Sequence, residues 1–246
     1  MTHSAQRFWQ TAWGLSALLC GCVGASRVWA EAVGSPASVL KKGQWSMSAS
    51  GGALQGRSLS GQGKATVYQG GHARGYGLTD WLSLYGKLGL ARITVDDPTI
   101  LKTNDSSSSN SFGANLFAAV QLKSRLWQHV PSQFEWDGSL QYIDMRASHK
   151  GKNEARWHEW QFATSVAKPF GRVKPYLGAK LSFVNMYYRV RQQGVLLKDG
   201  NYHQDSPFGV FVGSDFSLGA SEDVVLNVET SYQGGLETNL AIQYVF

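Results

Sequence analysis

Residues 224–246 read VVLNVETSYQGGLETNLAIQYVF, and this stretch indicates the fold class. Apolar and polar residues alternate through two runs, with Val228 between Asn227 and Glu229 in the first and Ile242 between Ala241 and Gln243 in the second. A period of two is typical of β-strands, and the intervening Gln-Gly-Gly is typical of a turn. The stretch therefore predicts an antiparallel hairpin.

The same alternation recurs along the chain, and helix-forming residues never keep a 3.6-residue period for long. It predicts an all-β protein, an up-and-down antiparallel transmembrane β-barrel of about ten strands, with eight or twelve as alternatives. The strands are expected at about 43–54, 64–78, 81–95, 112–123, 134–146, 157–167, 174–190, 207–218, 224–232 and from 238 to the end.

The two faces of these strands indicate which solvent they meet. One face is aliphatic or aromatic, whereas a soluble barrel hides such residues inside. A continuous apolar band exposed to water would be insoluble, whereas facing lipid it is expected, and lipid then requires a closed barrel without free edges. We expect an ion pair between Lys180 and Asp215. The other face carries charges in mid-strand that we assign to the lumen: Lys87, Glu135, Asp137, Glu159, Lys180, Asp215 and Glu229.

The connections between the strands fall into two alternating sets. Short periplasmic turns, longer extracellular loops and an even strand count are typical of bacterial outer-membrane barrels. Two connections, 124–133 and 233–237, depart from this rule in length. The expected periplasmic turns are 79–80, 124–133, 168–173 and 219–223, and the expected outer loops are 55–63, 96–111, 147–156, 191–206 and 233–237.

The N-terminus predicts export. Residues 1–30 contain Arg7 and no acidic residue, then a short apolar run, and end in Val-Trp-Ala before Glu31. This is typical of a secretory signal peptide cleaved after Ala30. Acylation at Cys22 as a lipoprotein is the less favoured alternative. We expect 31–42 to be a short flexible lead and 43–246 to be the barrel, without disulfides because both cysteines lie in the leader.

Charge and motifs exclude several function classes. The full chain carries a net charge of +6, and removing Arg7 and Arg27 leaves a dispersed +4, which does not suit a nucleic-acid partner. After residue 40 no apolar run is long enough for a transmembrane helix. The sequence shows no metal-binding or phosphate-loop motif, so we expect no cofactor and no metal.

Two stretches carry a resemblance to a known class. The ending Leu-Ala-Ile-Gln-Tyr-Val-Phe at 240–246 resembles the C-terminal signature of bacterial outer-membrane barrels, and residues 76–89 resemble the strand–turn–strand segments of small porin-like barrels. The resemblance covers the architecture of OmpA-, OmpX- and Opa-like proteins. It implies an outer-membrane location and recognition of Tyr244 and Phe246 by the assembly machinery.

A barrel of about ten strands encloses a narrow interior, because aqueous channels open at about 16 strands. We therefore expect a plugged structural or surface-interaction protein without catalysis, or at most a narrow channel. Basic residues near the outer loops are candidates for binding lipopolysaccharide phosphates, since Lys and Arg suit phosphate. These candidates are Lys150, Lys152, Arg156, Arg189 and Arg191, with Lys198 nearby.

Three alternatives remain open at this point. An omptin-like protease would use Asp96-Asp97 and His203-Gln204-Asp205 in outer loops to activate water, although the order of His and Asp is reversed. A lipid A hydrolase would need a Ser–His pair, for which Ser148-His149 is the candidate. A soluble lipocalin-like binding barrel would have its apolar face inside.

Overall fold

The computed structural model describes residues 39–96, 109–149, 153–192, 195–219 and 223–246. The expected signal peptide, with its sites at Ala30 and Cys22, lies outside the described residues. Within the described part, no helix is long and apolar enough to cross a membrane.

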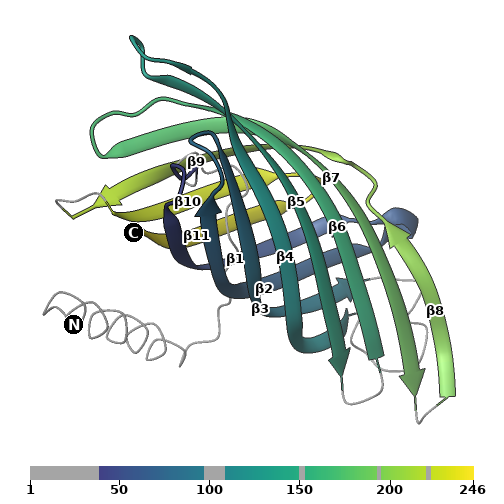
Figure 1. Cartoon of the computed structure of the whole chain (residues 1–246). Coiled ribbons are helices and arrows are strands. Elements are labelled where there is room, and N and C mark those ends of the chain that lie inside the picture. Colours follow the sequence, from purple (N-terminus) through teal and green to yellow (C-terminus); the bar gives the residue numbers. More distant parts are fainter. Residues whose placement is uncertain (1–38, 97–108, 150–152, 193–194, 220–222) are drawn as a thin grey trace, which may run out of the picture.

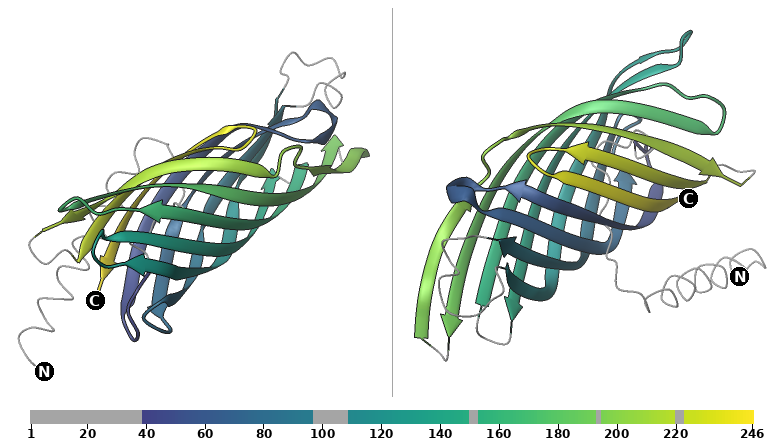
Figure 2. Two further views of the ribbon diagram at one scale, coloured as in Figure 1. Left: turned by 90° about the horizontal axis from the view of Figure 1, so that it is seen from above. Right: turned by 180° about the vertical axis from the view of Figure 1, so that it is seen from behind.

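Tilted antiparallel strands form a closed wall (Figures 1 and 2). A short 3-10 turn, η2 (Ser60–Gln62), joins the first two strands. The strands are β1 (Trp45–Ser58), β2 (Lys64–Gly77), β3 (Leu82–Asp96), β4 (Ser109–His129), β5 (Phe134–His149), β6 (Asn153–Ala167), β7 (Val173–Gln192), β8 (Val195–His203), β9 (Phe208–Leu218), β10 (Val224–Tyr232) and β11 (Leu236–Val245).

The chain folds as a ten-stranded barrel because β8 and β9 share one position in the wall. β7 pairs with β9 in its first half and with β8 in its second half, and β6 pairs with the other edge of β7. The circle closes where β1 pairs with β11. There the Trp45 amide donates to the Phe246 carbonyl at 3.1 Å, and the Phe246 amide donates back at 2.9 Å. The predicted fold class and strand number are confirmed.

The expected loops 55–63, 147–156 and 233–237 are shorter in the structure, because the flanking strands extend into them, and two further connections are wrong. The segment 191–206 is not a loop, because β8 continues the β7 hairpin and places Tyr202 inside and Asn201 outside. The connection 124–133 shrinks to residues 130–133, because the ladder between β4 and β5 continues to the pair His129–Phe134. We call the end of the barrel that carries this short turn and Phe246 the turn end, and the opposite end the loop end.

The described part of the N-terminal lead is held against the turn end. The Leu40 amide donates to Ser83 Oγ at 2.8 Å, and the Lys42 amide donates to Asp80 Oδ1 at 3.1 Å. The Leu40 side chain is only 2% exposed. Residues 39–42, which the sequence assigns to a flexible lead, thus contribute an apolar group to the turn end.

Both faces of the wall exchange apolar and polar side chains at the same height along the barrel. Towards the turn end, strands β5, β6 and β7 point Tyr142, Trp160 and Phe183 outwards. Beyond these residues the outward positions are polar, beginning with Asp144, His158 and Asn185. The inward positions change in the opposite sense, so buried polar side chains give way to apolar ones. The expectation that the apolar face points outwards along whole strands is therefore wrong for the loop end.

We call the part of the wall beyond Leu90, Tyr142, Trp160 and Phe183 the rim. Its interior is one apolar cluster that includes Ile93, Ile143, Met145, Trp157, Val184, Met186 and Tyr202, all buried. Apolar inside and polar outside is the pattern of a barrel in water. The wall therefore consists of a lipid-facing part and a rim built to stand in water.

Inward glycines provide space for aromatic rings that fill the interior. Each glycine lies directly opposite an aromatic residue in the register, and a Cβ on it would collide with the ring. Since only glycine leaves this room, such a pair lets a ring lie across the neighbouring strand. The pairs are Gly75–Tyr85, Gly89–Phe117, Gly178–Phe211, Gly213–Tyr176 and Gly200–Tyr188.

We expect Gly178→Ala to destabilise the barrel by about 1–3 kcal/mol, the usual cost of overpacking. The new Cβ would lie 2.2 Å from the Thr164 carbonyl oxygen and 2.3 Å from the Phe211 ring, so the backbone must move. Urea unfolding of the refolded protein in detergent would measure this. The control is Gly86→Ala, because Gly86 faces outwards with no atom within 4 Å of its added Cβ. Equal effects of the two substitutions would show that Gly178 is not needed to leave room for the Phe211 ring.

Candidate functional site

The interior of the lipid-facing part holds the charges expected in the lumen. All seven are buried: Lys87, Glu135, Asp137, Glu159, Lys180, Asp215 and Glu229. They lie on inward positions, and all but Asp215 are offset by one residue from an exposed apolar neighbour. Their contacts fall into three groups along the bore.

The central group crosses the bore. Arg57 on β1 pairs with Glu159 on β6, with 2.7 Å between Nη1 and Oε1. β1 and β6 are five positions apart in the ten-stranded wall, so this ion pair joins opposite sides of the barrel. Arg57 Nη2 also lies 3.8 Å from Glu237 Oε2, and Glu237 pairs with Lys180.

Hydrogen bonds complete this central group. Trp157 Nε1 donates to Glu159 Oε2 at 2.9 Å, and Gln161 Nε2 donates to Glu159 Oε1 at 2.8 Å. Lys180 Nζ donates to Ser231 Oγ at 2.8 Å. Both carboxylates therefore have several donors, which is the condition under which buried ion pairs are tolerated.

The second group lies nearer the turn end. Glu135 Oε2 is 3.0 Å from Lys174 Nζ and 3.4 Å from Arg125 Nη2. Arg125 Nε is also 3.6 Å from Asp137 Oδ1. These contacts join β4, β5 and β7 across the interior.

The third group surrounds the Tyr176 hydroxyl, which donates to Glu229 Oε2 at 3.0 Å. Asn227 Nδ2 donates to this hydroxyl at 2.8 Å and to Asp215 Oδ1 at 2.5 Å. The expected pair of Lys180 with Asp215 is wrong, because Lys180 lies opposite Gly209 in the register and pairs with Glu237.

Sequence reasoning missed several interior charges. Arg57 and Glu237 fall in segments expected to be loops, and Arg125 falls in an expected turn. With Lys123 and Lys174 included, the described interior holds six basic and six acidic side chains. The sequence does contain a signal that Glu237 points inwards. Glu237 and Asn239 continue the period-two alternation of β11 into the expected loop 233–237.

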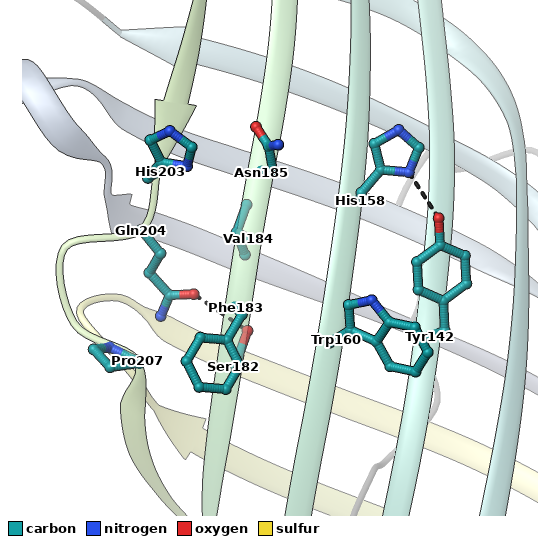
Figure 3. A pocket seen from close by; sticks show the side chains of 10 residues that line it. All are labelled: Tyr142, His158, Trp160, Ser182, Phe183, Val184, Asn185, His203, Gln204 and Pro207. Carbon is teal, nitrogen blue, oxygen red and sulfur yellow. Dashed lines mark hydrogen bonds between the residues drawn. The ribbon is translucent and has the colours of Figure 1, made fainter.

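A pocket of about 490 Å³ opens in the wall at the lower edge of the rim, between the level of the aromatic residues and that of the polar ones (Figure 3). The Tyr142 hydroxyl lies 2.9 Å from His158 Nδ1, and the Tyr142 and Trp160 rings are 4.8 Å apart. The pocket is lined by Tyr142, His158, Trp160, Ser182, Phe183, Val184, Asn185, His203, Gln204 and Pro207.

The basic candidates for phosphate binding are only partly described. Arg156 is exposed on the outer face of β6, with Nη2 3.3 Å from Asp144 Oδ2. Arg189 lies on the outer face of β7, with Nη2 2.9 Å from the Tyr187 hydroxyl and Nη1 3.9 Å from Glu154. Lys150, Lys152 and the side chains of Arg191 and Lys198 lie outside the described residues.

Three described residues of the catalytic alternatives, Asp96, Ser148 and His203, lie on different strands. His203 ends β8 and lines the wall pocket, whereas Asp96 ends β3. Ser148 Oγ accepts a hydrogen bond from Asn115 Nδ2 at 2.9 Å. Asp97 and the side chain of His149 lie outside the described residues. Among the described residues, no group of three or more His, Cys, Asp or Glu could hold a metal ion.

The two aromatic residues of the expected assembly signal lie at the turn end. Tyr244 is on the outer face of β11, and its ring stacks on that of Phe246 with 5.9 Å between centroids. Both side chains are exposed on the outside of the wall.

Comparison with known proteins finds only distant structural similarity. No protein-family model and no curated protein matches the chain. The outer membrane protease OmpT from Escherichia coli aligns at 9% identity and TM-score 0.46, over 83% of this chain and 97% of that one. The translocator domain of the autotransporter NalP from Neisseria meningitidis aligns at 10% identity and TM-score 0.45, over 98% and 96%. Ail from Yersinia pestis aligns at 9% and 0.39, over 84% and 100%.

The closed wall, its apolar outer band and its charged bore together define the class of protein. Large apolar side chains are exposed around the lipid-facing part, on β1, β3–β7 and β9–β11. The alternative of a soluble lipocalin-like barrel is wrong, since it requires the opposite arrangement of faces. The chain is an integral β-barrel of the bacterial outer membrane.

Proposed function

We propose that this protein is a sealed structural barrel, which neither conducts ions nor catalyses a reaction, and which presents its rim at the cell surface. The observation that carries the proposal is the Arg57–Glu159 ion pair, which spans the bore from β1 to the opposite strand β6. An ion passing through the bore would have to break this ion pair and the hydrogen bonds that are donated to Glu159.

Two further layers support a sealed bore. On the loop side of the ion pairs lies the apolar cluster of the rim, with Trp157 and Met186 fully buried. On the turn side, Tyr85 and Leu40 are buried as well. An apolar layer excludes ions because they lose hydration there without gaining partners.

Planar-bilayer recording should show no resolvable conductance steps for the wild-type protein. The double variant Arg57→Ser/Glu159→Ser removes both sides of the central pair and keeps the lumen neutral, so it should show discrete currents more often. Heat-modifiable gel mobility would establish that both proteins are folded. Regular steps from the wild type would overturn the proposal in favour of a narrow channel.

The partners we propose follow from the location. Arg156 and Arg189 point outwards on the rim, where they can meet phosphate groups of lipopolysaccharide. The exposed, stacked rings of Tyr244 and Phe246 offer the outer-membrane assembly machinery an apolar C-terminal contact. We propose no cofactor, metal or nucleic-acid partner.

A further inference from the structure

We propose that the wall pocket binds a phosphorylated, acylated sugar of the outer leaflet, that is, the lipid A portion of lipopolysaccharide. The pocket lies on the outer surface of β5, β6, β7 and β8, on the loop side of the lipid-facing band (Figure 3). Its volume of about 490 Å³ lies within the usual range for small-molecule sites.

The pocket arises from a break in the wall. β7 leaves β9 at the pair Leu181–Phe208 and meets β8 at the pair Asn185–His203. Between these pairs, three residues of β7 face the four residues 204–207. One ladder-like bond remains, from the Ser182 amide to the Pro207 carbonyl at 2.8 Å. The wall therefore widens here, and Ser182 and Val184 line the hollow although both are buried inward positions.

The outer surface of the same strands presents three kinds of chemistry in succession. Next to the pocket on the turn side are Leu140, Phe162 and Leu181, which are adjacent in the register and suit acyl chains. At the pocket itself the aromatic rings of Tyr142, Trp160 and Phe183 are neighbours. Rings with one apolar and one wet edge suit the level where lipid tails end.

Hydrogen-bonding groups follow on the loop side of these rings. His158 lies opposite Asn185, and Asn185 lies opposite His203, so the three side chains form a row above the aromatic level. Gln204 lines the pocket as well, and its amide accepts from Ser182 Oγ at 3.2 Å and donates to the Ser206 carbonyl. Amide and imidazole groups can both donate and accept, which suits the hydroxyls and acyl-amides of an amino sugar.

Two positively charged side chains lie on the loop side of this row. Arg146 and Arg156 face each other across β5 and β6. Both share the single carboxylate of Asp144, at 3.7 Å and 3.3 Å, so one basic charge is in excess there. Arg146 is 69% exposed and can turn towards a ligand. A guanidinium binds a phosphate with two parallel charge-assisted hydrogen bonds. Further out, Arg189 is offset by Glu154, so we place the phosphate at Arg146 and Arg156.

The order of acyl surface, amino-sugar surface and phosphate surface selects among outer-membrane amphiphiles. A phospholipid carries acyl chains and a phosphate but no amino-sugar ring, so it offers no hydroxyl or acyl-amide to the row of His158, Asn185 and His203. Inorganic phosphate uses the arginines alone. The proposal therefore distinguishes lipid A from both.

The test uses the full mature protein, refolded in detergent and freed of bound lipid, with binding measured by native mass spectrometry. Lipid A with two phosphates should bind, phosphatidylglycerol should bind at least ten-fold more weakly, and inorganic phosphate should not displace lipid A. Arg156→Gln should weaken lipid A binding about ten-fold, which is a usual effect of losing a charge-assisted hydrogen bond. His203→Ala should weaken it less, and Trp160→Ala should weaken it at least as much as Arg156→Gln.

Matched controls come from outward residues on the opposite part of the wall. Arg92→Gln on β3 and His72→Ala on β2 remove the same side chains from exposed outer positions away from the pocket, and both should bind lipid A normally. Heat-modifiable mobility of every variant checks folding. Wild-type affinity in both Arg156→Gln and Trp160→Ala, or equal losses in the controls, would overturn the site. Equal binding of phosphatidylglycerol would overturn the choice of ligand.

Discussion

Leu88→Arg is expected to reduce assembly of the barrel into the outer membrane. Leu88 lies on the outer face of β3 within the lipid-facing band, and its side chain is 68% exposed. An arginine on the lipid side of a barrel costs about 2–4 kcal/mol at the bilayer midplane and less towards the interfaces, and Leu88 lies between these levels. Cell fractionation, with heat-modifiable mobility as the readout, should show less of the folded form in the membrane fraction.

The control lies on the same strand and the same face. Thr94→Arg is placed beyond Leu90, where β3 belongs to the rim and already carries the outward Arg92. This variant should assemble like the wild type, because its new charge meets water. If Leu88→Arg and Thr94→Arg assemble equally well, the assignment of the apolar band to lipid is wrong.

Glu159→Ala should destabilise the refolded barrel by about 3–5 kcal/mol, the cost of leaving one partner of a buried ion pair alone. Glu159 accepts hydrogen bonds from Arg57, Trp157, Gln161 and Ser182, and all four donors would lose their acceptor. Urea unfolding in detergent, followed by tryptophan fluorescence, would show a lower midpoint.

Glu154→Ala is the matched control on the same strand. The Glu154 side chain is exposed on the outer face of the rim, and its contact with Arg189 is long at 3.9 Å. Such surface pairs contribute about 0–1 kcal/mol, so the midpoint should hardly change. A loss for Glu159→Ala as small as that for Glu154→Ala would show that the central group does not hold the barrel together.

The sequence predicts the strands well because a strand half in lipid and half in a polar bore must alternate at every step. β2, β9 and β10 begin and end within one residue of their expected bounds. The sequence does not predict β8 because its described outward residues, Asp199, Asn201 and His203, are polar, and a polar segment without an apolar face resembles a loop.

The inversion of the faces could not be predicted from periodicity alone. The period of two continues along β6, but its phase shifts at His158 and Glu159, so the apolar residues are Ala155 and Trp157 on one side and Trp160 and Phe162 on the other. Where the lipid ends depends on the neighbouring strands, and so does the identity of ion-pair partners. Arg57 and Glu159 are 102 residues apart, and a shift of one residue in any intervening register would separate them.

The junction between β1 and β11 requires the two ends of the barrel sequence to meet. The contacts that join these strands link residues near position 50 to residues near position 240, so this ladder joins segments that are very distant in sequence. Such nonlocal pairing is slow, because the intervening chain must lose conformational entropy before any stabilising contact forms. Until Phe246 meets Trp45, both β1 and β11 present open edges, and the exported chain has to be shielded from aggregation for that whole interval.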